Sequence, residues 1–350
     1  MSTELQERLD LLYAIGGGPG ANRVGYSAEE DEAHVLAAGW MRDAGLEVEV
    51  DPDGNLFGRR IGVDAGLAEV WCGSHLDSVP QGGRFDGALG VVAALEAVQR
   101  LGQRERTLTV VAFREEERGC VGSSGCVGRG MHPGAFLELH HEQGPRLALA
   151  GAPLAVVTGI VGYKRAERAI EGRAGHAGTT PMAVRDDALV MAAEEILRIR
   201  GVAASIEGAV ATVGWLEVEP GGVNVIPGRV RFTIDARAPD AERLARLLSE
   251  LGIDPAGATL PTPLGGAPAE ALRQAIGARG LPIIELASGA GHDAGVLARA
   301  GVPAAMLFVR ALNDGVSHSP DELSSEEDVQ LAVDVLGDAL ERLAESDLQV

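Results

Sequence analysis

Apolar and polar positions follow two different periods along this chain. Residues 46–50 alternate apolar and polar side chains, which is typical of a half-buried strand. Residues 107–113 form a short, nearly continuous apolar run, which indicates a buried strand. Residues 88–101 are apolar and helix-prone instead, and they follow a glycine. Strands that alternate with helices in this way predict an α/β fold, in which helices flank a mixed sheet.

The same patterns continue on both sides of these segments. Ser27 and Glu30 have the spacing of a capping box, so a helix is expected to begin there and to end near Gly45. The other expected helices are 3–13, 267–279, 294–300 and 324–344, and the other expected strands are 56–61, 68–72, 136–140, 281–287 and 304–309. Residues 119–134 are rich in Gly, Ser and Cys and indicate a loop or a short helix.

A second domain is predicted within the first. From about Val161 the order of expected elements becomes β-α-β-β-α-β, which is typical of a ferredoxin-like sandwich. These elements are 162–171, 185–200, 208–216, 229–237, 239–251 and a short strand near Thr259. We therefore expect an inserted domain at 161–264, and an outer domain that comprises 1–160 and 265–350.

Composition narrows the classes of partner. Asp and Glu total 51 residues against 30 Lys and Arg, which gives a net charge of −21 and makes nucleic acid an unlikely partner. No apolar run approaches the ~20 residues that span a membrane, and no leader pattern opens the chain. Three cysteines, without paired metal spacing, fit a reducing compartment. We expect a cytoplasmic protein with no membrane or nucleic-acid partner.

Polar side chains gather where expected strands end. His75 and Asp77 follow the strand 68–72, and Asp86 lies in the loop that enters the helix 88–101. The other members of this set are Glu116, Glu117, His140 and His318, which all lie at strand ends or in the loops that follow. Open α/β sheets place their sites at the carboxyl ends of strands.

Imidazoles and carboxylates in this arrangement indicate a dinuclear metal site. Two imidazoles at one metal, one imidazole and one carboxylate at the other, and a bridging carboxylate make a complete ligand set. Such a pair of metals activates a bridging water as the nucleophile, and a neighbouring carboxylate such as Glu116 takes its proton. Asp77 is expected to hold the second nitrogen of His75.

The chain also resembles a known family. The runs that carry the resemblance are GSHLD at 73–77, GRFDG at 83–87, EEE at 115–117, ELHHEQGP at 138–145, GHAGTTPM at 175–182, NVIPG at 224–228, SGAGHDA at 288–294 and SHSP at 317–320. Together they resemble the hydantoinase/carbamoylase branch of the M20 metallopeptidase family. That branch contains N-carbamoyl-L-amino-acid hydrolases, allantoate amidohydrolases and β-ureidopropionases, and it has a zinc-exopeptidase-like catalytic domain.

The resemblance implies roles for the residues of the outer domain. His75, Asp86 and His140 would hold one divalent ion, and Asp86, Glu117 and His318 would hold a second. Zn²⁺ is expected first, with Mn²⁺, Co²⁺ and Ni²⁺ as alternatives. Glu116 would act as general base and then as acid to the leaving nitrogen, while Asp77 would orient His75.

The resemblance also implies a substrate and an assembly. The expected substrate is a small carboxylic acid that carries an N-carbamoyl-type group, and hydrolysis of its C–N bond would release ammonia. His176 would polarise the scissile carbonyl and Arg237 would hold the substrate carboxylate. The remaining expected substrate contacts are Asn224, Gln143 and Gly291. The inserted domain would close over the site and form a homodimer.

Some features depart from the family pattern or leave alternatives open. Glu117 is followed by Arg118-Gly119-Cys120-Val121, where the family carries Gly-x-Arg-Phe, and the stretch from Glu117 to His140 is shorter than usual. His141 replaces an aliphatic residue. His292 could act in the site or brace its loop, and Arg237 could pair with an acid on its own sheet. The alternative functions are a dipeptidase and a member that binds small acids or metal without turnover.

Overall fold

The computed structural model describes residues 1–346 and 348, and the chain divides into two compact units. The first unit comprises Met1–Ile160 and Pro263–Val350, and the second is Val161–Thr262. The second unit therefore interrupts the first. The insertion predicted from sequence, 161–264, extends slightly further at its C-terminal boundary. The roles expected for the two parts, catalysis and lid or dimer formation, stay predictions.

The first unit is built on a mixed sheet, which is nine-stranded within the described residues. Its strands are β1 (Glu47–Val50), β2 (Leu56–Arg60), β3 (Val70–His75), β4 (Leu108–Phe113), β5 (Ala135–His141), β6 (Leu154–Ile160), β13 (Thr262–Pro263), β14 (Glu285–Ser288) and β15 (Ala304–Val309). They lie in the order β1-β2-β4-β3-β5-β15-β6-β13, and β14 pairs with β6. The four central strands, β4, β3, β5 and β15, run parallel to one another, so their carboxyl ends meet at one edge.

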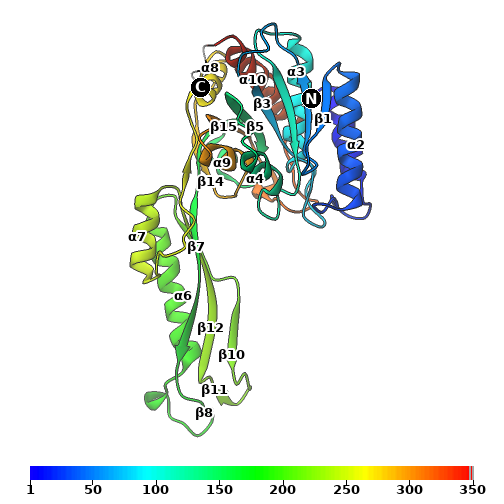
Figure 1. Cartoon of the computed structure of the whole chain (residues 1–350). Helices are drawn as coiled ribbons and strands as arrows, with labels where there is room; N and C mark the ends of the chain where they lie inside the picture. The colour runs from blue at the N-terminus through cyan, green and yellow to red at the C-terminus, as the bar shows by residue number, and fades with distance from the viewer. Residues whose placement is uncertain (347, 349–350) are drawn as a thin grey trace. The chain divides into compact units, whose positions relative to one another are not determined.

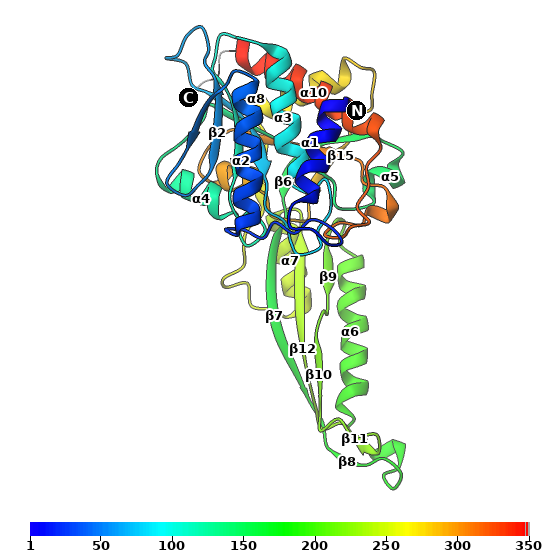
Figure 2. The ribbon, with the colours of Figure 1, turned by 90° about the vertical axis from the view of Figure 1, so that its right-hand side faces the viewer.

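Helices cover both faces of this sheet, as predicted. The helices of the first unit are α1 (Thr3–Ala14), α2 (Ala28–Asp43), α3 (Ala88–Leu101), α4 (Val121–Gly128), α5 (Arg146–Ala150), α8 (Ala267–Gly277), α9 (Asp293–Arg299) and α10 (Glu326–Glu345), with the 3-10 helix η2 (Asn313–Gly315). Apolar residues of α1, α2, α3, α8 and α10 share one core with the sheet, and those of α4, α5 and α9 share the other. Figure 1 shows α4 and α9 together on one side of the sheet, and Figure 2 shows α1, α2 and α3 on the other.

The strands divide their side chains between these two cores because successive residues point to opposite faces. Val70 and Cys72 of β3 belong to the core under α3, whereas Trp71 belongs to the other. In β4, Val110 and Val111 divide in the same way. Burial on both faces explains why these central strands read as continuous apolar runs in the sequence.

Most expected elements of the first unit are present, with small differences at their ends. Ser27 caps α2, because its side chain accepts a hydrogen bond from Glu30 N–H. The capping box is incomplete, since Glu30 accepts instead from the backbone N–H of Tyr26 and of Glu115. The sequence analysis missed β6 and α5. β6 ends at Ile160 and β7 begins at Gly162, so no loop separates the two strands in the sequence.

The second unit contains β7 (Gly162–Glu171), β8 (Gly175–His176), η1 (Met182–Val184), α6 (Ala188–Ala204), β9 (Val210–Thr212), β10 (Leu216–Glu219), β11 (Val225–Ile226), β12 (Arg229–Ala238) and α7 (Ala241–Leu251). β12 lies between β7 and the strands β9 and β10, all antiparallel to it. β9 lies within the predicted strand 208–216, whereas β10 begins only at its last residue and was not predicted. The predicted last strand is an isolated bridge between Tyr163 and Thr259. Apolar residues of α6 and α7 pack on β12 to form this unit's own core.

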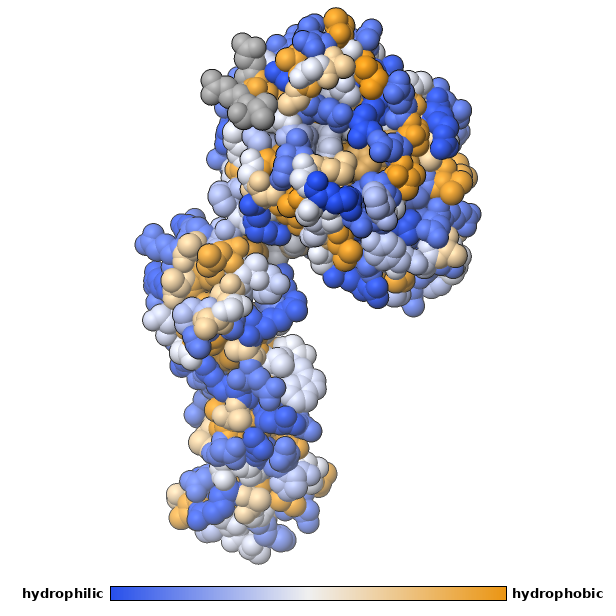
Figure 3. Space-filling view, in the orientation of Figure 1, coloured by the Kyte–Doolittle hydropathy of each residue, from blue (hydrophilic) through white to orange (hydrophobic). Residues whose placement is uncertain are grey.

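The surface reflects the composition. In the view of Figure 3, hydrophilic residues cover much of each unit, and hydrophobic residues are scattered among them. Among the described residues, no helix has both the length and the apolar content that a membrane span needs. The expected cytoplasmic location stays a prediction.

Candidate metal centre

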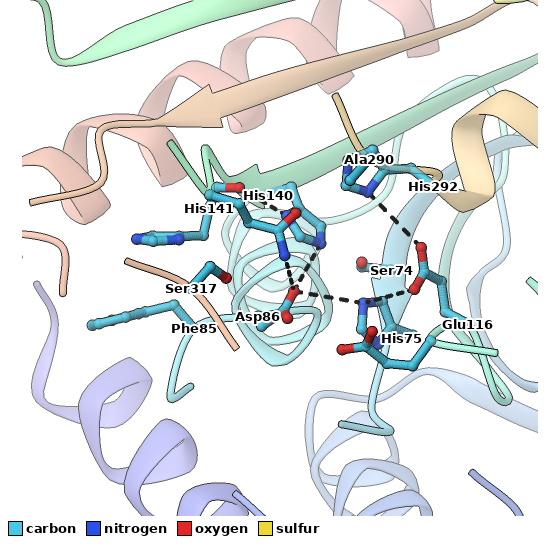
Figure 4. A network of polar contacts seen from close by, with 12 residues as sticks. Ser74, His75, Phe85, Asp86, Glu116, His140, His141, Ala290, His292 and Ser317 are labelled. Atoms are coloured by element: carbon cyan, nitrogen blue, oxygen red, sulfur yellow. Dashed lines mark hydrogen bonds and ion pairs between the residues drawn. The ribbon is translucent and has the colours of Figure 1, made fainter. Parts of the chain in front are cut away.

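The parallel strands bring the predicted ligands to one edge of the sheet. His75 is the last residue of β3, and His140 lies near the end of β5. Glu116 and Glu117 follow β4, and His318 lies in the segment after β15. Because the carboxyl ends of parallel strands meet at one edge, residues far apart in sequence become neighbours. Figure 4 shows His75, Asp86, Glu116 and His140 pointing toward one another.

A first group of possible ligands consists of His75, Asp86 and His140. One ligand atom from each lies within 4.8 Å of the others, and all three residues are buried. His140 Nε2 lies 3.4 Å from Asp86 Oδ1, and His75 Nε2 lies 4.0 Å from the same oxygen. Two imidazole nitrogens and a carboxylate oxygen are a suitable donor set for Zn²⁺, Mn²⁺, Co²⁺ or Ni²⁺.

A second group consists of Asp86, Glu117 and His318, which meet the same distance limit. His318 Nε2 lies 3.2 Å from Asp86 Oδ2 and 3.5 Å from Glu117 Oε2. Asp86 therefore faces the first group with Oδ1 and the second with Oδ2. This is the geometry that a bridging carboxylate requires. The His318 side chain is 49% exposed, whereas the other members are largely buried.

The polar atoms of these groups fit a bound cation. Within the described residues, His140 Nε2 and Glu117 Oε1 are buried without a hydrogen-bond partner. His140 Nδ1 already contacts the carbonyl of His141 at 2.9 Å, which leaves Nε2 as the nitrogen for the site. Buried lone pairs without a donor are costly, and a divalent ion in their midst would satisfy them.

The pKa values of several side chains in the site are shifted because titratable groups lie close together and are largely buried. The pKa of Asp86 is held well below its usual range, because contact with the imidazoles of His318, His140 and His75 outweighs burial. Burial, together with the charge of Asp86, raises the pKa of Glu117 to about 7. The hydrogen bond to Asp86 raises the pKa of His318 to about 9.

Asp77 contacts both the imidazole of His75 and the backbone of the two glutamates that follow β4. Its Oδ1 lies 3.1 Å from His75 Nδ1 and also accepts a hydrogen bond from Glu116 N–H at 3.0 Å. Its Oδ2 accepts from Glu117 N–H at 3.1 Å. The contact with His75 Nδ1 leaves Nε2 directed at Asp86. Asp77 was predicted only to orient His75, and the hydrogen bonds to the backbone after β4 were not predicted.

Glu116 lies between two histidines. Its Oε2 is 3.8 Å from His75 Nε2, and its Oε1 is 3.9 Å from His292 Nδ1. Burial raises its pKa well above the usual value, as in catalytic carboxylates that exchange protons. The sequence left two interpretations of His292 open, a role in the site and a role in bracing its loop, and its contacts fit both. Its Nε2 contacts Ser288 Oγ at 2.8 Å, so it braces its loop while Nδ1 faces Glu116.

Glu138 is a neighbour of the site that the sequence analysis did not identify. Together with His140 and His292 it forms a third group whose ligand atoms lie within 4.8 Å. Its two oxygens already accept hydrogen bonds, from Ser74 Oγ at 2.8 Å and from Ala294 N–H at 2.9 Å. The signal was present in the sequence, because residues two apart in a strand share a face, as Glu138 and His140 do.

The first unit also provides a pocket beside these groups. Its volume is about 350 Å³, and it is lined by Glu142, Gln143, Ser288, Gly289, Ala290, Ser317 and His318. Gln143, a predicted substrate contact, donates a hydrogen bond from Nε2 to Asp86 Oδ1 at 3.2 Å. Gly291 is exposed in the same loop as Gly289 and Ala290. The pocket therefore reaches one member of the second ligand group, His318.

The predicted substrate residues of the second unit do not gather at one point of that unit. His176 and Asn224 are close, because Val225 pairs with His176 and Ala177 N–H donates to the Asn224 carbonyl at 2.9 Å. Arg237 lies at the opposite end of β12, eight positions from Arg229, or about 26 Å along a strand.

Arg237 already binds a carboxylate. Its Nε and Nη2 donate to the two oxygens of Asp235, at 2.7 and 3.1 Å. The alternative raised from the sequence, pairing with an acid on its own sheet, is therefore present in the structure. A two-point contact of this kind is also the contact that Arg237 was expected to make with a substrate carboxylate.

Comparison with known proteins gives consistent matches. The family model described as Peptidase family M20/M25/M40 matches residues 71–342. The chain is 36% identical to an N-carbamoyl-L-amino acid amidohydrolase from Geobacillus stearothermophilus, with 98% of each chain covered. It is 32% identical to an allantoate amidohydrolase from Bacillus subtilis, with 95% of each chain covered. A crystal structure of an amidase of the hydantoinase/carbamoylase family from Burkholderia multivorans superposes with a TM-score of 0.90, at 32% identity and 96% coverage of both chains.

Proposed function

Because the chain belongs to peptidase family M20/M25/M40, we propose that it is a metal-dependent amidohydrolase of small carboxylic acids. The resemblance to the hydantoinase/carbamoylase branch, predicted from the motifs, is thereby confirmed. The bond cleaved is a non-peptide C–N bond. The substrate class that we propose is an N-carbamoyl-L-amino acid or allantoate, since relatives named for both substrates match nearly the whole chain.

The observation that carries the proposal is the shared carboxylate of Asp86. Two ligand groups meet on its two oxygens, one with His75 and His140 and the other with Glu117 and His318. We propose that each group holds one divalent ion, Zn²⁺ first among Zn²⁺, Mn²⁺, Co²⁺ and Ni²⁺. When bound, such a pair would lower the pKa of a coordinated water and polarise the substrate carbonyl.

Glu116 supplies the proton transfers in this proposal. It accepts a proton from the attacking water and later delivers it to the leaving nitrogen, which departs as ammonia. With an N-carbamoyl substrate the remaining carbamate decomposes to carbon dioxide and the free amino acid, so the atoms balance with one water consumed. Asp77 supports the step by holding the Glu116 backbone and the His75 ring.

Substrate recognition is assigned to residues of both units. We propose that Gln143 and Gly291 contact the substrate from the first unit, and that His176, Asn224 and Arg237 contribute from the second. In this role Arg237 would exchange its contact with Asp235 for the substrate carboxylate, which an arginine can bind through two parallel hydrogen bonds. His176 would donate to the carbonyl oxygen as negative charge develops on it.

The proposal includes a homodimer formed through the second unit and a cytoplasmic location. The three described cysteines are free and buried, which supports a reducing compartment.

A substrate panel on metal-reconstituted protein tests the proposal. Ammonia release is measured with N-carbamoyl-L-amino acids and allantoate after loading with Zn²⁺, Mn²⁺, Co²⁺ or Ni²⁺, and a dipeptide panel is run in parallel. We expect turnover of a carbamoyl-type acid and a loss of about 10²- to 10⁴-fold in Glu116→Gln, with metal content retained. Preferential cleavage of dipeptides would favour the dipeptidase alternative. Tight metal binding without any turnover would favour a binding-only protein.

A further inference from the structure

We propose that Glu322 is a positioning residue that sets the distance between Asp86 and His318, and thereby holds the second ion of the centre. The inference rests on the proposed dinuclear function. Glu322 lies in the loop before α10, and neither the motifs nor the comparisons assign it a role. It is 5% exposed although it belongs to a loop, so its carboxylate is buried for a reason other than packing.

Glu322 binds the two segments that carry Asp86 and His318. Its Oε1 accepts hydrogen bonds from the backbone N–H of Phe85 at 2.7 Å and of Asp86 at 2.9 Å. Its Oε2 accepts from Ser317 Oγ at 3.0 Å. One carboxylate group therefore joins the backbone of the bridging ligand to the residue directly before His318.

The end of β5 is tied to the same loop. The imidazole of His141 stacks on Phe85, with ring centroids 6.0 Å apart and an interplanar angle of 14°. His141 Nε2 contacts the carbonyl of Leu323 at 3.3 Å, and Nδ1 lies 3.9 Å from Glu322 Oε2. Figure 4 shows Phe85, His141 and Ser317 on one side of Asp86, with Glu116 on the other. Glu322 thus supports the centre from the side away from the proposed base.

The space around Glu322 is fitted to its carboxylate. A Cβ added to Gly83 would lie 2.1 Å from Glu322 Oε2. Position 83 must therefore be glycine to leave room for the Glu322 carboxylate. His318 depends on this support more than the other ligands do. His75 and His140 extend from strands whose ladders fix them, whereas His318 lies in a loop with φ of +54° and a half-exposed side chain.

The hydrogen bonds predict which ion is affected. Without Glu322, His75 and His140 keep their strand ladders, and Asp86 loses one backbone hydrogen bond but stays beside the start of α3. The segment that carries Ser317 and His318 loses its link to Asp86 altogether. The ion held by Asp86, Glu117 and His318 should then bind more weakly, while the first ion is retained. Loss of a residue that positions a metal ligand typically weakens metal binding by about 10- to 100-fold.

The test is a Mn²⁺ titration of the metal-free full-length protein, followed by electron paramagnetic resonance. Two ions that share a carboxylate give an exchange-coupled spectrum, and a single ion gives isolated six-line Mn²⁺. We expect wild type to reach the coupled spectrum and Glu322→Ala to stop at one ion, with the second dissociation constant raised about 10- to 100-fold. In Glu322→Gln the amide oxygen still accepts both backbone N–H groups, and its NH₂ donates to Ser317 Oγ. That variant should restore the coupled spectrum.

Two further variants separate positioning from general destabilisation. Asp328→Ala removes another carboxylate that is also 5% exposed; it pairs with Arg310 at 2.7 Å, and neither residue belongs to a ligand group. It should lower stability and leave both Mn²⁺ dissociation constants unchanged. Ser317→Ala deletes one hydrogen bond and keeps the loop, so it tests the link even when Glu322→Ala does not fold. We expect its second dissociation constant to rise by several-fold.

The proposal is overturned by a coupled two-ion spectrum in Glu322→Ala, by an unchanged second dissociation constant in Ser317→Ala, or by equal losses in Asp328→Ala. A wild-type protein that binds fewer than two ions also overturns it. The titration uses no substrate. If wild type binds two ions but turns over nothing, the proposed activity fails while the role of Glu322 is still decided.

Discussion

Asp77 holds the backbone of Glu116, because its Oδ1 accepts the Glu116 N–H at 3.0 Å. The same oxygen lies 3.1 Å from His75 Nδ1, and Oδ2 accepts the Glu117 N–H at 3.1 Å. One buried side chain thus fixes an imidazole ligand, the proposed base and a carboxylate ligand together. A change at Asp77 should therefore affect metal binding and proton transfer at once.

Asp77→Asn should lower both metal affinity and kcat/KM, each by about 10- to 100-fold. An amide keeps one acceptor oxygen, and its NH₂ would face either a backbone N–H or the imidazole. Asp51→Asn is a matched control, since Asp51 Oδ1 also accepts two backbone N–H groups, those of Asp53 and Asn55, in the turn between β1 and β2. Metal titration and steady-state kinetics measure the effect. Equal losses in the two variants would mean that Asp77 has no specific role.

Gly87→Ala should displace His75 and weaken metal binding. A Cβ at Gly87 would lie 2.4 Å from atoms of the His75 ring. Gly102, at the other end of α3, has nearly the same backbone angle, with φ of +67° against +63°, and within the described residues nothing lies within 4 Å of a Cβ there. Both variants should lose about 1–3 kcal/mol of stability, because a residue with a Cβ rarely adopts either backbone conformation. Only Gly87→Ala should also lose metal, as measured by metal content after dialysis. Full metal content in that variant would contradict the prediction.

Addition of divalent ions should stabilise the fold. An ion that binds only the folded state at 100 times its dissociation constant adds about 2.7 kcal/mol to the free energy of unfolding. Urea unfolding of metal-free protein, with and without Mn²⁺, measures the gain. Asp86→Ala removes the shared carboxylate and should abolish it. A gain of the same size in Asp86→Ala would place the bound ion elsewhere on the protein.

His34 should make the fold sensitive to acid. Burial lowers its pKa from 6.5 to about 3, and within the described residues neither ring nitrogen has a hydrogen-bond partner. Between these two values the unfolded chain binds a proton that the folded chain excludes, so stability falls as pH drops below 6.5. At about 1.4 kcal/mol per pH unit, the loss by pH 5 is about 2 kcal/mol.

His34→Leu should remove that part of the acid sensitivity. Urea unfolding at pH 7.5 and at pH 5 measures it, and the variant should lose about 2 kcal/mol less than wild type over this interval. His132 is exposed, so His132→Leu serves as the control and should follow wild type. Parallel stability curves for His34→Leu and wild type would show that His34 does not contribute.

The fold could be predicted from sequence wherever periodicity was undisturbed. The helix expected at 88–101 is α3, and the strand expected at 304–309 is β15. β6 was missed because it joins β7 after a single residue, so that no loop marks the boundary between two strands of different units. The pattern of a chain does not record where it leaves one sheet and enters another.

The candidate ligands could be predicted because they lie at strand ends or in the loops beyond them, but the residues that support them could not. Glu322 and Glu138 act through hydrogen bonds to residues distant in sequence, and no local pattern specifies such partners. The mutual distances of His176, Asn224 and Arg237 depend in the same way on the register of β12, which alternation alone does not fix.

The position of β15 between β5 and β6 has a consequence for synthesis on the ribosome. Until Ala304–Val309 emerges, the edge of β5 that carries His140 has no neighbour on that side, and the segment bearing His318 has not been made. A nascent chain therefore displays an open, apolar strand edge while residues 142–303 are being made, and that edge is a site for mispairing. The second group of ligands, which needs His318, is completed only after β15 has been made.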